Sequence, residues 1–269
     1  MDLNEQFRRG DANLVSYLAH LSATAPGGSF DDSDGVLTFA GGHAYPGTYT
    51  NGVIRIRDDV PPEVVFQRAQ NFFKPLKRGY ALWIRDHADS DLEALAKNAG
   101  LFQRPPVEGN PGIACTSGVI SPQALDADIT MRRVDDDVSR RHYLEVVVAG
   151  YGIEGMPFDL AERVVFSTAS IDDARVAAYV AYIDGVPLSG CMAYTEGATA
   201  GLQWGATLVG ARGRGLGKAT FIEANNAAVT EFGAELVVSQ ASQMGVPLWV
   251  SLGFEIITRY RRYLAKPPR

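Results

Sequence analysis

The sequence predicts an α/β protein of the α+β type, made of two domains that each hold a mixed, mostly antiparallel sheet flanked by helices. The chain has 269 residues, of which 46% are hydrophobic, so it can build two cores of ordinary domain size. Strand-like and helix-like patterns alternate along both halves. Between the halves, residues 117–128 are weakly periodic and rich in turn formers, as a linker is. We therefore expect domains at residues 1–125 and 126–269.

Composition excludes several classes of protein. The formal net charge is −6, which argues against general binding to nucleic acid. No stretch approaches the ~18 consecutive apolar residues of a membrane span, and residues 1–6 are too polar for a secretory signal. The two cysteines, Cys115 and Cys191, lie far apart and in no metal-binding spacing. We expect a cytoplasmic protein with reduced thiols, no metal, and no nucleic-acid or membrane partner; a disulfide between the halves is the alternative.

The first half contains four predictable elements. Val53–Arg57 alternates between apolar and polar residues, which is typical of a strand. Pro61 is placed to start a helix that ends near Gly79. Tyr80–Arg85 follows as a strand, and Asp91–Ala99 as a helix before a Gly-Leu-Phe sequence.

The second half begins with a short strand at Ile129–Val134, followed by a helix that runs from the aspartates 135–137 to about Gly150. Three consecutive carboxylates suggest metal ligands, but carboxylates at a helix N-terminus are also favoured by capping and by the helix dipole. We interpret them as capping residues. Asp159–Ser167 is predicted to be a second short helix.

The remaining elements follow from turn chemistry and periodicity. Asp184-Gly185 is a tight-turn sequence between two apolar runs and predicts a hairpin. Phe221, Ala224, Ala228 and Phe232 lie on one helical face. The predicted elements are strands at Val176–Ile183, Leu188–Thr195 and Thr199–Val209, the helix that ends at Gly233, a strand at Glu235–Ser239, a helix at Gly245–Leu252 and a strand at Phe254–Leu264.

The two halves have similar spacing. Pro61 and Gly79 are separated by the same 18 positions as Gly215 and Gly233, and each helix is followed by a strand, a helix and a Gly/Leu/Phe ending. This order predicts an internal duplication. The first half lacks the glycines, because residues 57–62 hold two carboxylates and two prolines instead. Carboxylates repel a phosphate and proline has no N–H, so we expect the first half to have no anion site.

A glycine-rich segment opens the helix of the second half. Residues 212–218 read Arg-Gly-Arg-Gly-Leu-Gly-Lys, and exposed amides at a helix N-terminus bind anions such as pyrophosphate. A Walker A loop would need glycine where Arg212 stands and Ser or Thr where Ala219 stands. A dinucleotide fingerprint would need glycine at Lys218 or Thr220. Neither pattern matches.

A third pattern does match. Arg212-x-x-Gly215-x-Gly217 after a strand is similar to the pyrophosphate loop of the GNAT N-acetyltransferase superfamily. Downstream, residues 242–254 (SQMGVPLWVSLGF) resemble the family element N-x-x-A-x-x-L-Y-x-x-L-G-F, with Ser242 in the asparagine slot and Trp249 in the tyrosine slot. The resemblance covers about residues 128–265, and the duplication implies a tandem of two GNAT-like domains with a degenerate first copy.

The resemblance implies that acetyl-CoA is the co-substrate. It implies that the loop amides hold the pyrophosphate, that Thr207–Val209 pair with the pantetheine arm, and that an amide near Val209 polarises the thioester carbonyl. It also implies that the strand before the loop diverges from the strand at Glu235–Ser239 to admit the thioester. The cofactor-binding residues expected on this basis are Thr207, Leu208, Val209, Arg212, Gly213, Arg214, Gly215, Leu216, Gly217 and Lys218.

The sequence motifs identify the catalytic groups less well than the cofactor-binding residues. Trp249 stands where the family has its tyrosine acid, and an indole N–H does not release a proton at useful cost. Ser242 is the candidate catalytic residue, orienting a water or the thiolate; the alternative is that it caps the following helix. Tyr260 and Tyr263 are possible substitutes for the acid. For a general base the candidates are Glu196 and His142, each of which is equally explained as a solvated or partly buried side chain.

The predicted activity is transfer of an acetyl group to a primary amine of a small molecule or peptide. The acidic net charge favours a cationic amine. The loop Tyr151–Phe158, with Gly152 and Gly155, either lines the substrate cleft or merely connects two helices. We expect the first half to cover or shape that cleft. The alternative function is a non-catalytic acyl-CoA sensor or a partner-binding pseudoenzyme, and the oligomeric state stays open, a homodimer included.

Overall fold

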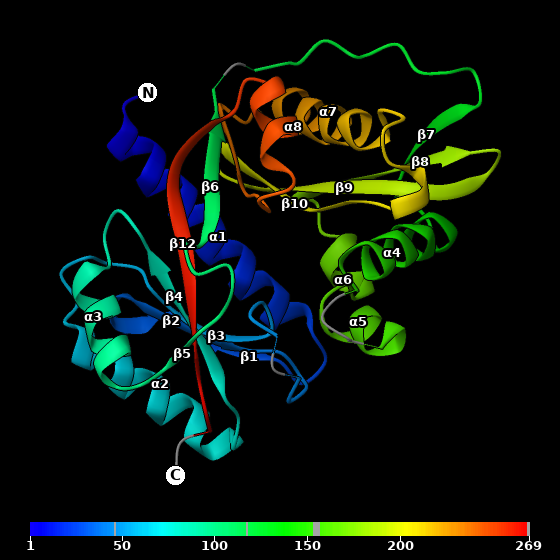
Figure 1. The fold of residues 1–269 in the computed structure, drawn as a ribbon. Helices are drawn as coiled ribbons and strands as arrows, with labels where there is room; N and C mark the ends of the chain where they lie inside the picture. The colour runs from blue at the N-terminus through cyan, green and yellow to red at the C-terminus, as the bar shows by residue number, and fades with distance from the viewer. Residues whose placement is uncertain (46, 117, 153–156, 268–269) are drawn as a thin grey trace.

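The strands of both halves join one continuous sheet in the computed structural model, which describes residues 1–45, 47–116, 118–152 and 157–267 (Figure 1). Helix α1 (Leu3–Thr24) begins at Asp2, whose carboxylate accepts a hydrogen bond from the Glu5 amide. No element was predicted for these residues. The helix packs against β2 of the first half and against β9 and β10 of the second, so it belongs to the core of both.

The predicted elements of the first half are present with small shifts at their ends. The predicted strand at 53–57 is β3, the predicted helix from Pro61 is α2, and Tyr80–Arg85 is β4 at both predicted bounds. The elements of this half are β1 (Ser29–Asp31), β2 (Val36–Ala40), β3 (Asn51–Arg55), α2 (Pro62–Leu76), β4 (Tyr80–Arg85), α3 (Ser90–Asn98), β5 (Phe102–Gln103) and β6 (Asn110–Cys115).

The second half also follows the predicted order. Its elements are β7 (Ile129–Arg133), α4 (Asp137–Tyr151), α5 (Phe158–Val164), α6 (Thr168–Ile171), β8 (Val176–Ile183), β9 (Val186–Glu196), β10 (Thr199–Thr207), α7 (Leu216–Thr230), β11 (Leu236–Gln240), α8 (Val246–Ser251) and β12 (Glu255–Ala265). In Figure 1, α7 and α8 cover one face of this part of the sheet and α4, α5 and α6 cover the other.

The aspartates before α4 cap the helix. Asp136 is the N-cap, and its carboxylate accepts hydrogen bonds from the amide and the hydroxyl of Ser139. The Ser139 amide in particular lowers the pKa of Asp136 to about 2. No cluster of His, Cys, Asp and Glu among the described residues is arranged to hold a metal ion. The capping interpretation is confirmed for Asp136, whereas Asp135 and Asp137 pair with Arg132 and Arg140.

The internal duplication is visible in the strand pairing. In the first half, β3 and β4 are parallel, with Gly52 opposite Ala81, and α2 connects them. In the second half, β10 and β11 are parallel, with Thr199 opposite Leu236, and α7 connects them. In both halves the parallel pair is extended by an antiparallel neighbour, β2 or β9.

The two halves exchange their last strands. The sheet order is β1-β2-β3-β4-β12-β6-β11-β10-β9-β8-β7, with β5 also pairing with β12. Strand β12 of the second half therefore lies against β4 of the first, with Tyr260 opposite Arg85, and β6 of the first lies against β11 of the second, with Ala114 opposite Val238. The division at 125/126 stays a prediction about chain segments, but the sheet does not divide there.

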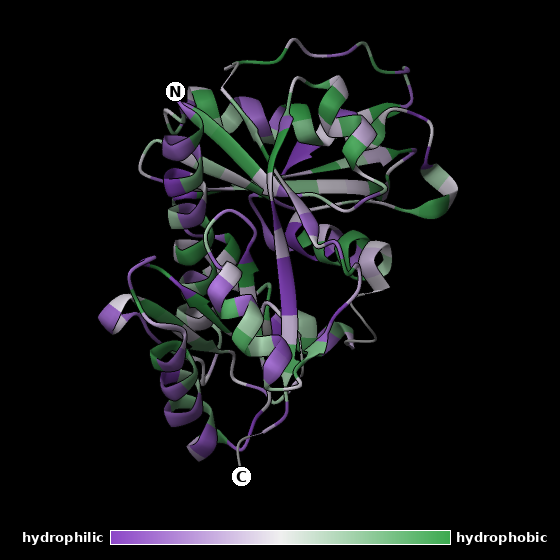
Figure 2. Cartoon of the chain, turned by 60° about the vertical axis from the view of Figure 1, so that its left-hand side comes forward, coloured by the Kyte–Doolittle hydropathy of each residue, from purple (hydrophilic) through white to green (hydrophobic). Residues whose placement is uncertain are grey.

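The exchanged strand β12 differs from the rest of the sheet in its hydropathy. In Figure 2, β12, the vertical strand at the centre, carries much of the hydrophilic colour that the sheet shows, because it holds Arg259, Arg261 and Arg262. Cys115 and Cys191 are both buried and form no disulfide with each other. Within the part of the chain that the structure describes, no helix has the length and apolar composition of a membrane span.

Candidate functional site

Strands β10 and β11 pair over only part of their length. The parallel register runs from Thr199–Leu236 to Gly201–Val238 and then stops. Past this point the register of β10 against β9 shifts between Gln203 and Ala206, and Trp204 adopts a left-handed backbone with φ 51°. This β-bulge bends β10 away from β11. The expected divergence of the two strands is therefore present.

A cavity of about 530 Å³ lies where the strands diverge. The second half lines it with residues 202–207 of β10, residues 239–242 at the end of β11, and Gly217 at the start of α7. The first half contributes residues 47–50 and Arg104, and β12 contributes Arg262. The two halves thus build one cavity between them, in line with the expectation that the first half shapes the cleft.

The glycine segment presents unpaired amides beside this cavity. Gly215 is the N-cap of α7 with φ 79°, and Gly213 has φ 81°. The N–H groups of residues 213–218 have no hydrogen-bond acceptor among the described residues. A Cβ on Gly217 would lie 2.9 Å from Thr207 Oγ1, so glycine keeps the passage between loop and strand open. Free amides at the positive end of a helix form an anion site.

The side chains of the predicted cofactor-binding residues point to different partners, and only some lie near the cavity. Arg212 Nε donates to Thr207 O at 3.3 Å and its Nη1 lies 3.6 Å from Met244 Sδ, so it spans the opening. Arg214 instead pairs with Asp128 at 2.8 Å. The Leu216 side chain is buried in the core, so only its amide is available to a ligand. Lys218 forms no ion pair within the described part of the chain.

The three residues before the loop, Thr207 to Val209, also differ in what they can offer a ligand. Thr207 lines the cavity, and its hydroxyl lies 2.8 Å from Ser189 Oγ. The Leu208 amide donates to Leu188 O and is therefore used by the sheet. The Val209 amide has no acceptor among the residues described, and its side chain is exposed. Of Leu208 and Val209, only Val209 has an amide free for a ligand carbonyl.

One contact of the glycine loop was not predicted. Gln123 Nε2 donates to Gly215 O at 2.9 Å, and it would lie 2.7 Å from a Cβ on Gly215. The segment before it is held along α7, because Asn226 exchanges two hydrogen bonds with the backbone of Ile120. The linker therefore supports the outer side of the loop, and Gly217 rather than Gly215 faces the cavity. No sequence motif marks Gln123.

Ser242 and Trp249 lie at the other wall. Ser242 lines the cavity, and its Oγ accepts a hydrogen bond from the Gly245 amide at 3.2 Å. This hydrogen bond lies in the turn before α8, whose N-cap is Gly245 without a side-chain cap, so it does not decide between the two interpretations of Ser242. The hydroxyl proton remains available to a second partner. Trp249 is 4% exposed and its ring centroid lies 4.3 Å from that of Phe221. It packs as a core residue in the slot where the motif has tyrosine.

The other predicted acids and bases do not reach the cavity. Tyr260 Oη donates to Asp11 and Tyr263 Oη to Glu93, because the strand exchange turns both tyrosines toward the first half. His142 Nδ1, on α4, lies 3.2 Å from Tyr182 Oη on β8. Glu196 pairs with Arg175 at the end of β9. These four candidates are wrong for the cavity as the structure describes it.

An aromatic wall was missed. The Trp204 ring centroid lies 4.9 Å from that of Tyr49 and 5.6 Å from that of Tyr151. Tyr151 Oη donates to Gly205 O and Trp204 Nε1 donates to Tyr17 Oη, so both rings are held in place. Of the loop predicted at 151–158, Tyr151 lines the cavity, whereas Gly155 lies outside the described residues.

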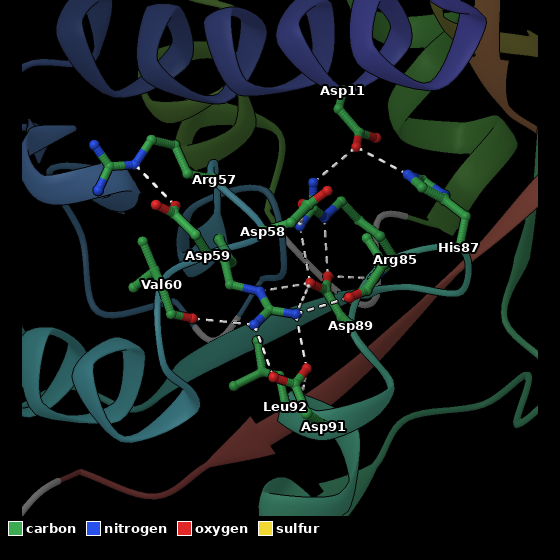
Figure 3. Close-up of polar contacts among 12 residues, drawn as sticks. Asp11, Arg57, Asp58, Asp59, Val60, Arg85, His87, Asp89, Asp91 and Leu92 are labelled. Carbon is green, nitrogen blue, oxygen red and sulfur yellow. Dashed lines mark hydrogen bonds and ion pairs between the residues drawn. The ribbon is translucent and has the colours of Figure 1, made fainter. Parts of the chain in front are cut away.

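At the corresponding strand ends of the first half lies a network of ion pairs (Figure 3). Arg55 ends β3 and Arg85 ends β4, and both donate to the buried carboxylate of Asp89. Asp58, from the segment that replaces the glycine loop, accepts a hydrogen bond from Arg85 at 2.8 Å. Arg55, Asp58 and Arg85 also line a second pocket, of about 1280 Å³, which α1 borders.

Known structures share this architecture. A GCN5-related N-acetyltransferase from Kribbella flavida superposes with a TM-score of 0.72 at 16% identity, covering 96% of this chain and 95% of that chain. A tandem GNAT protein from the clavulanic acid biosynthesis pathway gives 0.61 at 12% identity over 100% and 98%. A GCN5-related N-acetyltransferase from Sphaerobacter thermophilus gives 0.62 at 13% identity over 89% and 82%.

At these identities the likeness establishes the fold. The chain has the tandem GNAT fold that the two sequence motifs and the duplication predicted. No family model matches the chain, and no curated protein matches its sequence.

Proposed function

We propose that this protein is an acetyl-CoA-dependent N-acetyltransferase that acts on a primary amine of a small molecule or peptide. One observation carries the proposal: the amides of residues 213–218 have no acceptor among the described residues, and Arg212 and Gly217 of this segment line the cavity between β10 and β11. Such amides suit a pyrophosphate, and a gap beside an unpaired strand edge suits the extended pantetheine arm. The fold shared with GNAT structures supports the same assignment.

The residues would divide the work by position. The amides of 213–218 would hold the pyrophosphate, with Arg212 adding positive charge beside them. The free edge of β10 up to Thr207 would pair with the pantetheine amides. The Val209 amide would polarise the thioester carbonyl, since it has no acceptor among the described residues.

Acetyl-CoA supplies an activated acyl group whose carbonyl carbon a neutral amine attacks. The amine nitrogen forms the new C–N bond, the C–S bond breaks, and the departing thiolate takes up the proton that the nitrogen loses, which gives the amide and the free thiol. A thiol pKa of about 8.5 makes the thiolate a good leaving group without a dedicated acid. Ser242 Oγ, which accepts from the Gly245 amide and keeps its own proton available, would donate a hydrogen bond to that thiolate.

The lining carries no strong base. Among the described residues that line the cavity there is no Asp, Glu, His or Lys. The amine would therefore reach the cavity already neutral, with its proton lost to water. The same observation favours one alternative: an acyl-CoA sensor without turnover, which needs the anion site and no base.

Isothermal titration of acetyl-CoA tests the binding part. We expect one site per chain in the wild type and loss of binding in Gly217→Ala, because the added Cβ meets Thr207 Oγ1. Gly210→Ala is the matched control, since a Cβ there meets nothing within 4 Å. No binding to the wild type would overturn the proposal.

Thiol release measured with a panel of amines then separates enzyme from sensor: saturable binding without release by any amine would favour the sensor.

A further inference from the structure

The far end of the cavity is built for an anion. We infer that the amine acetylated by this protein also carries a carboxylate, and that Arg262 binds this carboxylate. The inference rests on the proposed function for the identity of the ligand as an acceptor substrate. It assigns a specificity role to a residue outside both sequence motifs.

Strand exchange places Arg262 in the cavity. Arg262 lies on β12, opposite Trp83 of β4, and its guanidinium carbon is 5.6 Å from the centre of the Trp83 ring. Its Nη2 donates to Asn110 Oδ1 on β6. Both neighbours come from the first half, so the position of this guanidinium depends on the tandem arrangement.

The charge of Arg262 is not balanced by a carboxylate. Its contacts within the described part of the chain are an amide oxygen and an aromatic face, and it appears in no ion pair there. The adjacent Arg261 differs, because it points to the other face of the sheet and pairs with Asp86 at 2.7 Å. A half-buried guanidinium without an anion is unfavourable unless a ligand supplies one.

The surroundings strengthen the positive potential. Arg104 also lines the cavity, and its amide donates to Arg262 O. Burial lowers the pKa of both guanidinium groups, and the charge of Arg262 lowers the pKa of Arg104 further. With no Asp or Glu among the described lining residues, the cavity favours an anion, although the whole chain has a net charge of −6. The expectation of a cationic substrate, drawn from net charge, finds no support in this lining.

Aromatic rings separate this charge from the bulge of β10. The Tyr49 ring contacts Trp204 on one side and Trp83, which lies under Arg262, on the other, with centroids 4.9 and 5.3 Å apart. Rings of this kind pack against an apolar or aromatic body. A guanidinium fork matches the two oxygens of a carboxylate. The acceptor class is therefore a small amine with an apolar or aromatic body and a carboxylate.

The first experiment compares pairs of amines that differ only in the carboxylate: phenylalanine with phenethylamine, and 6-aminohexanoate with pentylamine. With the wild type and acetyl-CoA, we expect the carboxylate member of the better pair to have a kcat/KM about 10-fold to 100-fold higher, as for a charge-assisted hydrogen bond. Arg262→Gln should remove this preference by slowing only the carboxylate member. Arg262→Lys should restore part of it, and Arg261→Gln, on the other face of the sheet, should leave it unchanged.

A binding measurement covers the case in which none of the four amines is acetylated. We expect 3-phenylpropionate to bind the CoA-saturated wild type at least 10-fold more tightly than the neutral 3-phenylpropanamide, and Arg262→Gln to abolish the difference. Equal affinity of the two compounds, a preference for amines without a carboxylate, or an unchanged preference in Arg262→Gln would each overturn the inference. Failure of the proposed function would be recorded separately, as absence of acetyl-CoA binding to the wild type.

Discussion

Arg55 Nε donates a hydrogen bond to Asp89 Oδ1 at 2.8 Å, and both side chains are buried. Asp89 also accepts hydrogen bonds from the amide and the guanidinium of Arg85. The pair lies where β3 and β4 end, which is the counterpart of the cavity between β10 and β11. Buried ion pairs thus hold the ends of β3 and β4 in the first half, where β10 and β11 of the second half diverge.

Asp89→Asn is expected to lower the free energy of unfolding by about 3 kcal/mol or more, because it leaves two buried guanidinium groups short of a counter-charge. Urea unfolding followed by circular dichroism measures this change. Asp59→Asn is the matched control, since the Asp59 side chain is 78% exposed in its pair with Arg57 and such pairs contribute little. Equal effects of the two variants would contradict a structural role for the buried network.

Ser242→Ala is expected to lower kcat about 10-fold and to leave the KM for acetyl-CoA nearly unchanged, since one hydrogen bond to a charged group is lost in the transition state. Ser242→Thr keeps the hydroxyl and should restore most of kcat. Steady-state kinetics with a saturating amine measures both variants.

The hydrogen bond from the Gly245 amide to Ser242 has a separate signature. Its loss in Ser242→Ala should cost about 1 kcal/mol of unfolding free energy, because the Gly245 amide loses its side-chain acceptor. If Ser242→Ala lost stability but kept full kcat, the role of Ser242 would be structural alone.

His20 predicts a pH dependence of stability. Its ring is buried, with Nε2 3.0 Å from Ser170 O and Nδ1 3.3 Å from Arg175 Nη2. Burial lowers the pKa of His20 below its ordinary value of 6.5. As pH falls through 6.5 the unfolded chain binds the proton and the folded chain does not, so the free energy of unfolding decreases until the lower folded pKa is reached.

The measurement is urea unfolding at several pH values between 7.5 and 5.0, a range chosen to span roughly the reference histidine pKa. His20→Gln should be less stable than the wild type near neutral pH, and the difference between them should shrink as the pH falls. His43→Gln, at an exposed position, controls for the loss of a histidine as such. Parallel curves for wild type and His20→Gln would refute the assignment.

Residues 126–269 expressed alone are expected to aggregate or to lack cooperative unfolding. In this fragment β12 loses its partners β4 and β6, and β11 loses β6. Unpaired strand edges promote association between chains. Solubility and thermal unfolding of the fragment measure this, and co-expression with residues 1–125 should restore both. A soluble, cooperatively unfolding fragment that retains acetyl-CoA binding would show that the second half does not need the first.

Elements with strong local signals were predicted well. The Asp184-Gly185 turn and the strand before it were found because tight-turn residues and alternation are local properties. Helix α1 was missed although Leu14, Leu18 and Leu21 fall at helical spacing, since its face also buries Asp11 and Asn13. Strand β6 was missed because its sequence contains Pro111 and Gly112, which are typical of turns; β11 and β12 on either side hold it extended.

The candidate site was predicted at one end only. The glycine segment was found because three glycines within five positions, directly before a helix, leave the backbone open to close approach by a ligand. Tyr49 and Arg262 carry no motif, and they reach the cavity only because strands far apart in the chain lie side by side. Tyr260 and Tyr263 were considered as candidate acids, but β12 carries them to the first half. Nothing in their own sequence indicates this crossing.

By itself the sequence determined the fold class, the duplication and the glycine loop, because backbone conformation, turn type and helix capping depend on residues within a few positions of one another. Only the tertiary structure decided which half completes which sheet and which side chains close the cavity. Strand pairing between β12 and β4 is a long-range hydrogen-bond register that no local pattern encodes. That register carries Arg262 to Trp83 and Asn110, and with it the charge at the far end of the cavity.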